Sequence, residues 1–375
     1  MRRYLYLGIV LLAFTGVACP PTPPPLTDPP KTDETKIDKL PTPIENVAQL
    51  RPRIEGALDI VRSRELTTRH GFWTVFHGIL GLGPKNTMLT DAKTRKKINA
   101  IEYICDGGQL EGLEFLPTKE GLDVYTSMGN DPLQTRAQGH QDQFIAEMTQ
   151  WGMQPGQPFR VAGKDYAFAD FIRHSTMRTS VTKNQELSWA IIIIAQFRST
   201  DHKWINSFGE KLHFEDVVRY ELNASINEAA CGGTHRLFGL TWAYHLHLNR
   251  GGKKSVVWKD VETKLDEHKA LAKKLQNRDG TFSTDYFKGP GENPDPTARI
   301  STTGHIIEWL ALTMTDDELR SPWMQNAVNA LVHLILDLPD RADGGSLYHA
   351  AHGLHLYHER VFGTPAPYLP LLPRK

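Results

Sequence analysis

Apolar residues recur at intervals of three and four along much of the chain. Ile54, Ala57, Leu58 and Val61 follow this interval, which places them on one face of an α-helix. The same periodicity predicts helices over residues 144–151, 187–197, 237–248, 261–275, 305–314, 323–336 and 346–361. Alternating patterns typical of strands are nearly absent, apart from one candidate hairpin at residues 159–168. The pattern therefore predicts an all-α fold.

Several of these helices are predicted to open with a histidine, often beside a glycine. The histidines concerned are His77, His140, His235, His305 and His352. Asn184-Gln185-Glu186 provides a sixth opening, with Asn184 as the expected N-cap. Successive openings are separated by roughly 45 to 70 residues, the length of a helix-pair repeat with insertions. Six such pairs closed into a ring form an (α/α)6 toroid whose inner helices bring their N-termini to one mouth.

The predicted mouth gathers the candidate site residues. The candidate catalytic residues are Glu186, His235, His305 and Glu308. The residues expected to line the cavity are His77, His140, Asp142, Trp189, Arg236 and His352. For any single histidine, capping or packing is the simpler interpretation, and the recurrence across several helix starts is what favours a shared cavity.

The chain begins with a pattern typical of export. A cationic Met1-Arg2-Arg3 is followed by an apolar run over residues 4–17 and by Ala18-Cys19. This is the layout of a secretory signal, and Cys19 is the expected lipidation site of a membrane-anchored lipoprotein. Gly16 departs from the usual lipoprotein signal, so cleavage after Ala18, giving a periplasmic or extracellular protein, stays open. Residues 1–19 are thus assigned to a signal, 20–45 to a proline-rich tether, 46–365 to the toroid and 366–375 to a tail.

Composition removes several classes of function. The 43 basic and 43 acidic side chains balance to zero, unlike the basic surface of a nucleic-acid-binding protein. The chain contains neither a P-loop nor a dinucleotide fingerprint, so no nucleotide or other cofactor is expected. Besides Cys19 there are Cys105 and Cys231, which either form a disulfide or remain free thiols. No metal site is assigned, although His305 and Glu308 are three residues apart, as a metal-binding pair or a helical ion pair would be.

One segment resembles a turn found in known toroids. Residues 276–282, Gln-Asn-Arg-Asp-Gly-Thr-Phe, are similar to the turn that closes helix pairs in terpenoid cyclases and protein prenyltransferase β-subunits. Residues 70–362 as a whole resemble a family of uncharacterised exported planctomycete proteins, through segments 105–108, 139–144, 184–189, 231–237 and 344–349. The resemblance implies the toroid fold and no particular activity.

Two classes of function remain. A toroid cavity with acids, histidines and aromatic residues suits a hydrolase or lyase acting on a polysaccharide, because such reactions need a proton donor or base. The alternative is a non-catalytic binding or scaffold protein of the cell envelope, for which the lipid anchor and a glycan ligand would be the partners. Zinc chemistry of the prenyltransferase kind is disfavoured, since Gly232-Gly233 interrupts the helix face that Cys231 and His235 would share.

Overall fold

The computed structural model describes residues 41–126, 140–337 and 344–363, all of which lie in one unit of the chain, residues 40–375. The expected signal, Cys19 and most of the tether therefore fall outside the described residues. The α-helices are α1 (Leu50–Ser63), α2 (Phe72–Leu82), α3 (Ala100–Cys105), α4 (Gln143–Gln150), α5 (Phe168–Arg178), α6 (Ala190–Phe197), α7 (Phe214–Asn223), α8 (Thr234–Asn249), α9 (Val256–Lys274), α10 (Pro296–Thr313), α11 (Asp316–Leu319), α12 (Pro322–Asp337) and α13 (Gly344–Phe362). Short 3₁₀ helices cover Val47–Gln49 and Ala230–Gly233.

Small sheets connect the helices in the first two thirds of the chain. One sheet has the order β1 (Leu66–Thr67), β2 (Met88–Thr90) and β3 (Lys97–Asn99). Three antiparallel hairpins follow: β4 (Leu113–Thr118) with β5 (Gly121–Thr126), β6 (Pro158–Val161) with β7 (Lys164–Ala167), and β8 (Lys203–Ile205) with β9 (Lys211–His213). The β6–β7 hairpin confirms the one strand pair expected from sequence. Helices nevertheless dominate the described residues, as predicted.

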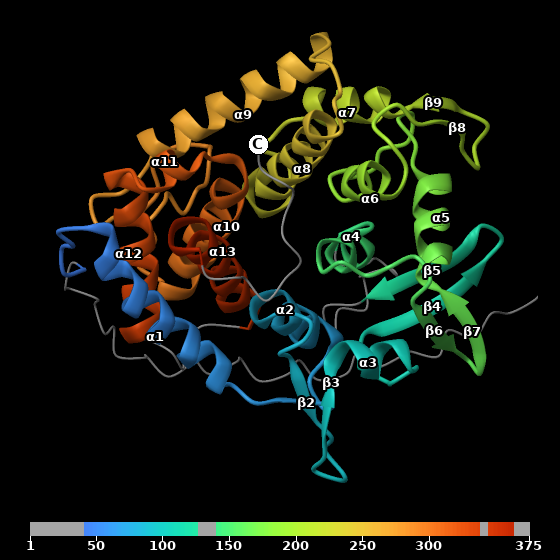
Figure 1. The fold of residues 1–375 in the computed structure, drawn as a ribbon, viewed down its shortest axis with the longest axis horizontal. Coiled ribbons are helices and arrows are strands. Elements are labelled where there is room, and N and C mark those ends of the chain that lie inside the picture. Colours follow the sequence, from blue (N-terminus) through green and yellow to red (C-terminus); the bar gives the residue numbers. More distant parts are fainter. Residues whose placement is uncertain (1–40, 127–139, 338–343, 364–375) are drawn as a thin grey trace, which may run out of the picture. The chain divides into compact units, whose positions relative to one another are not determined.

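Six helices follow one another as neighbours in a closed order (Figure 1). α2 packs against α13, α13 against α10, α10 against α8, α8 against α6, and α6 against α4. The rings of Phe72 and Phe76 in α2 lie 5.8 and 5.7 Å from the ring of Phe144 in α4, which joins the last helix to the first. Other helices lie against members of this set. α1 and α12 pack on α13, and α12 also packs on α10. α5 packs on α6, and both α7 and α9 pack on α8.

Glycines allow two of these helix pairs to approach closely. A Cβ on Gly239 of α8 would lie 2.1 Å from the carbonyl oxygen of Ser188, just before α6. A Cβ on Gly304 of α10 would lie 2.8 Å from Cα of Ala350 in α13. Side chains on neighbouring turns of these helices therefore meet across short distances.

The turn at residues 276–282 adopts the predicted form. Gly280 has a φ of 92°, and the Gln276 side-chain amide donates to the carbonyl oxygens of Gly280 and Trp323 at 2.9 and 2.8 Å. The turn thereby ties the end of α9 to the start of α12. No helix in the described ranges has the length and apolar character needed to cross a membrane.

Candidate metal centre

A left-handed turn places Cys231 beside His235 at the start of α8. Cys231, Gly232 and Gly233 have φ angles of 48°, 62° and 90°, a conformation that is costly for a residue with a Cβ. A Cβ on Gly232 would lie 2.0 Å from the Tyr286 ring, so this position requires glycine. The two glycines that argued against a shared helix face are therefore the residues that bend the chain and bring Cys231 and His235 together.

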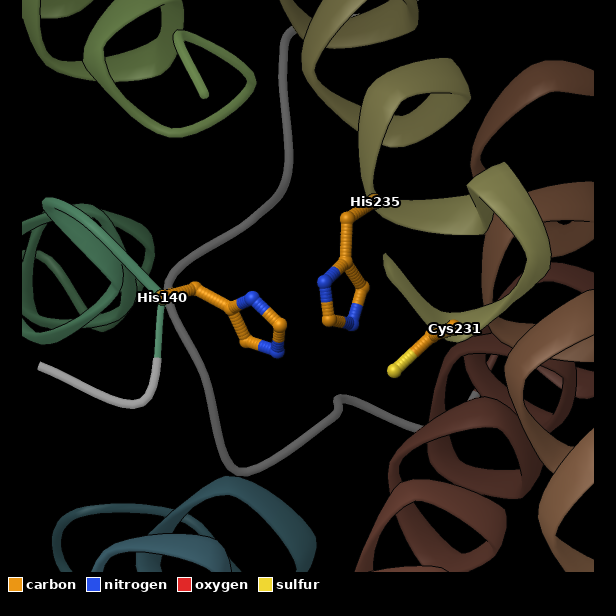
Figure 2. A group of neighbouring side chains, drawn as sticks. All are labelled: His140, Cys231 and His235. Carbon is orange, nitrogen blue, oxygen red and sulfur yellow. The ribbon is translucent and has the colours of Figure 1, made fainter. Parts of the chain in front are cut away.

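His140, Cys231 and His235 converge on one point (Figure 2). Their donor atoms all lie within 4.8 Å of one another. Figure 2 shows the three side chains pointing toward a shared space, His140 from the residues before α4 and the other two from the start of α8. His235 is buried with 4% exposure, whereas His140 and Cys231 are half-buried. The group thus has one deep ligand and two ligands on its open side.

A second group shares His235. The donor atoms of His235, His305 and His349 also lie within 4.8 Å of one another, and all three residues are buried. The ring centroids of His305 and His349 are 3.9 Å apart, and those of His235 and His305 are 5.7 Å apart. His77 extends the row, with its ring 5.0 Å from that of His349.

Hydrogen bonds orient most of these imidazoles through Nδ1. His305 Nδ1 donates to the Ser301 carbonyl oxygen at 2.8 Å. His140 Nδ1 lies 3.1 Å from Glu186 Oε2, and His349 Nδ1 lies 3.0 Å from Glu308 Oε2. Because a carbonyl or carboxylate accepts, Nδ1 carries the proton and Nε2 keeps its lone pair, which is the arrangement of metal-binding histidines.

Within the described part of the chain, neither ring nitrogen of His235 has a hydrogen-bond partner, although both nitrogens are buried. Buried polar groups in proteins are nearly always paired, so an unpartnered imidazole needs an explanation. Nε2 of His305 and Oε1 of Glu186 are buried and unpartnered in the same region. These atoms carry lone pairs that no described hydrogen-bond donor uses. Unused lone pairs that lie close together are what a cation site needs.

A small cavity lies on the His305 side of His235. It is lined by Glu147, Gln150, Trp189, Thr234, His235, Phe238, His305, Glu308 and Trp309. Its volume is about 10 Å³, which is room for one water molecule or one ion. A sugar ring does not fit in this space, so a polymeric substrate would have to bind on the open side, near His140 and Cys231.

Two carboxyl groups of this cavity have opposite protonation preferences. Burial, together with the charge of Glu308, raises the pKa of Glu147 well above its usual range. Burial alone would raise the pKa of Glu308 too, but His349 and His352, which both hydrogen bond to it, hold that pKa well below the usual range. Their surroundings thus push the two pKa values apart, toward the protonated form of Glu147 and the ionised form of Glu308, and general acid–base sites use such a difference.

Burial, with the nearby carboxylates of Glu186 and Glu308, raises the pKa of the Cys231 thiol to about 12. Such a thiol stays protonated and is a poor free nucleophile. A bound cation reverses this preference, because a coordinating thiol loses its proton. The surroundings of Cys231 therefore suit a metal ligand better than an activated catalytic cysteine.

The structure brings together most of the residues predicted from sequence. Those in the cluster or against it are His77, His140, Glu186, Trp189, His235, His305, Glu308 and His352. His77, His305 and His352 lie inside their helices, because α2, α10 and α13 begin earlier than expected. Asn184 does not cap α6, which starts at Ala190, and the Leu187 amide is instead bound by Glu221 Oε1 at 2.9 Å.

Asp142 and Arg236 were expected in the cavity, and the structure places both elsewhere. Asp142 is fully buried and pairs with Arg178 Nη2 at 2.7 Å. Arg236 Nε donates to Glu221 Oε2 at 2.8 Å, so its side chain turns toward α7. Each side chain is held by an oppositely charged partner that is distant in the sequence, and the sequence alone does not reveal that partner.

The structure contradicts the disulfide between Cys105 and Cys231. Both cysteines are free thiols. Cys105 ends α3, where its thiol lies near Gln157, whereas Cys231 faces the histidine cluster. The second of the two interpretations drawn from sequence is therefore correct.

His349 is a site residue that the sequence analysis did not single out. α13 carries His349, His352, His355 and His358, a histidine at every third position. This spacing was a readable signal for a functional helix. Glu147, by contrast, was among the carboxylates that the sequence analysis expected at the mouth, and it lines the small cavity.

Comparisons with known proteins add no further constraint. No family model matches the chain, no curated protein matches it, and no solved structure matches it.

Proposed function

We propose that this protein is a metal-dependent enzyme whose centre is a zinc ion bound by His140, Cys231 and His235. The observation that carries the proposal is the convergence of one thiol and two imidazoles within 4.8 Å. Thiolate and imidazole are the ligands that zinc prefers, and three protein ligands leave a fourth position for water or substrate. In a tetrahedral site with zinc–nitrogen distances of about 2.1 Å, ligand nitrogens lie about 3.4 Å apart. Small rotations of these side chains reach that geometry.

The surrounding residues support catalysis. A zinc ion held here would lower the pKa of a bound water toward neutrality. Glu186 fixes the His140 ring, Glu147 is a protonated acid beside the cavity, and Glu308 is a carboxylate that holds His349 and His352. A substrate would approach from the half-buried side formed by His140 and Cys231. These residues suit the cleavage of a polysaccharide, by hydrolysis or by the elimination that a lyase catalyses, because both reactions need proton transfer.

The fold proposal is an (α/α)6 toroid of the terpenoid cyclase and prenyltransferase kind. The closed order of α2, α4, α6, α8, α10 and α13, with other helices against them, supports it. The proposed place of action is outside the cytoplasm, with Cys19 as a lipid anchor, and it rests on the pattern of residues 1–19. Cysteines of exported proteins often form disulfides, yet Cys231 is a free thiol among histidines. A role as a metal ligand would explain why it stays free.

A non-catalytic cell-envelope protein is the second candidate. The deep burial of His235 favours it, because a metal enclosed by protein ligands can serve stability alone. In that case removal of zinc would unfold the protein, and zinc-loaded protein would bind a glycan without altering it.

The test uses purified full-length protein titrated with Co²⁺ as a spectroscopic substitute for zinc. A thiolate-to-cobalt absorption band is expected in the wild type, absent in Cys231→Ser and weakened in His140→Asn. His202→Gln, a histidine paired with Trp204 away from the cluster, serves as the matched control and should keep the band. Absence of the band in folded wild-type protein would rule out the centre. Polysaccharides are then screened with zinc-loaded protein for new reducing ends and unsaturated uronate, and equal blanks for wild type and Cys231→Ser would favour the non-catalytic candidate.

A further inference from the structure

We infer that the cluster binds a second metal ion, held by His235, His305 and His349, and that the imidazole of His235 bridges the two ions. This inference rests on the proposed zinc centre and extends it to a binuclear one. The two groups of donor atoms share only His235, and each group is confined within 4.8 Å.

His235 is suited to bridge two ions. Its two ring nitrogens point away from each other, and both are buried without a hydrogen-bond partner among the described residues. The centroid of its ring lies 4.8 Å from that of His140 and 5.7 Å from that of His305. One nitrogen would serve the group with Cys231, and the other would serve the group with His305 and His349.

The other two ligands of the second site are already oriented. His305 Nδ1 donates to the Ser301 carbonyl, and His349 Nδ1 donates to Glu308, so both rings keep the Nε2 lone pair for a cation. Nε2 of His305 is buried and unpartnered. Three imidazoles without a thiolate form a site for Zn²⁺, Cu²⁺ or Ni²⁺ rather than for Ca²⁺ or Mg²⁺.

A small cavity adjoins two of the three ligands of this site. It is lined by His235, His305 and Glu308, and not by His349, His140 or Cys231, and its volume of about 10 Å³ matches one ion or water. The Glu308 carboxylate accepts a hydrogen bond from His349 and so places a negative charge near this site. The first ion would thus lie on the side of His140 and Cys231, and the second between His235, His305 and His349, next to this cavity.

The binding step balances without any redox change. Cys231 releases its thiol proton and His235 its remaining N–H proton to solvent, and the sulfur and the two ring nitrogens each form one bond to a divalent ion. The buried second ion would act on the first through the shared imidazolate of His235. The second ion would also set the charge next to Glu147.

The experiment is a Co²⁺ titration of the full-length protein followed by absorption, EPR and metal analysis. Two equivalents are expected, the thiolate band belonging to only one of them. EPR intensity per cobalt should fall as the second equivalent binds, because a bridging imidazolate couples the two spins. This wild-type measurement needs no variant to fold.

Variants then assign the sites, with far-UV circular dichroism as the folding control. His305→Asn and His349→Asn should remove one equivalent of Co²⁺ and keep the thiolate band. Cys231→Ser should remove the thiolate band and keep the imidazole-only equivalent. His235→Asn should weaken the binding of both equivalents. A single equivalent that is insensitive to His305→Asn and His349→Asn overturns the second site and leaves the proposed zinc centre intact. Wild-type protein that binds the imidazole-only equivalent and shows no thiolate band contradicts the proposed centre instead. Loss of only one equivalent in His235→Asn overturns the bridge.

Discussion

His140 and His235 lie edge to face, with ring centroids 4.8 Å apart and ring planes at 83°. One precedes α4 and the other begins α8, so the contact joins two segments distant in sequence. Glu186 holds the first ring, and the turn at Cys231 carries the second. Each of these supports can be removed separately, which gives distinct predictions.

Glu186 should act on metal affinity through His140. Replacing it by alanine removes the acceptor for His140 Nδ1, and loss of such an orienting group typically weakens metal binding about 10- to 100-fold. Glu186→Gln keeps an acceptor and should lose less. Glu228→Ala, at an exposed glutamate close to Cys231 in sequence, is the control and should bind Co²⁺ as the wild type does. Equal affinities for Glu186→Ala and Glu228→Ala would show that Glu186 does not support the site.

Gly232 should be intolerant of even one added methyl group. Gly232→Ala places a Cβ 2.0 Å from the Tyr286 ring at a φ of 62°, so both contact and backbone become unfavourable. Gly163→Ala is a matched control, because its φ is 78° with no atom within 4 Å of the added Cβ. We expect the control to lose about 1–2 kcal/mol of unfolding free energy. Gly232→Ala should lose roughly 1–3 kcal/mol more, together with the thiolate–cobalt band. Urea unfolding of the two variants measures the difference, and similar losses would contradict it.

Arg236 should matter for stability and not for metal binding. Its guanidinium pairs with the fully buried Glu221, and removal of one partner of a buried pair costs roughly 3–5 kcal/mol. Arg236→Met should therefore lower the unfolding free energy strongly while folded protein keeps full metal stoichiometry. Arg62→Met breaks the exposed pair with Asp59 and should cost about 0–1 kcal/mol. If folded Arg236→Met protein lost its metal, Arg236 would have to support metal binding after all.

Acid should destabilise the fold through His355. Burial lowers its pKa to about 3, and the nearby charges of Arg62, His352 and His358 act in the same direction. The unfolded chain binds a proton near the ordinary value of 6.5 and the folded chain does not, so stability is complete above that pH and falls between it and about 3. One such histidine contributes a slope of about 1.4 kcal/mol per pH unit.

His355→Gln removes that titration. Urea unfolding at about pH 4.5 and about pH 6.5 should therefore show a shallower loss of stability in the variant than in the wild type. Parallel losses would mean that His355 titrates alike in the folded and unfolded chain.

Periodicity in the sequence predicted the helical part of the fold well. The apolar positions of α1, for example Ile54 and Val61, are fully buried as expected, and the hairpin at residues 159–168 is present. Helix starts were less accurate. α10 begins at Pro296, where Asp295 accepts hydrogen bonds from the first turn, and this polar opening carries no apolar periodicity.

That several histidines lie close together was predicted from their recurrence near the expected helix starts. What the sequence could not indicate was which partner each side chain takes. Arg236 and Asp142 are sequence neighbours of cluster residues, yet Glu221 and Arg178 draw them away. Conversely, Cys231 and His235 meet only because three successive residues are left-handed, a conformation that glycine permits but does not enforce.

The position of α13 in the closed order of helices has a consequence for synthesis. α13 follows every other described helix in the chain, yet it contacts both α2 and α10 and supplies His349 and His352. A nascent chain that has not reached Gly344 lacks one side of the cluster and leaves α2 and α10 without their shared neighbour. The group of His235, His305 and His349 can therefore form only after translation of the last helix, whereas His140, Cys231 and His235 all lie in earlier segments.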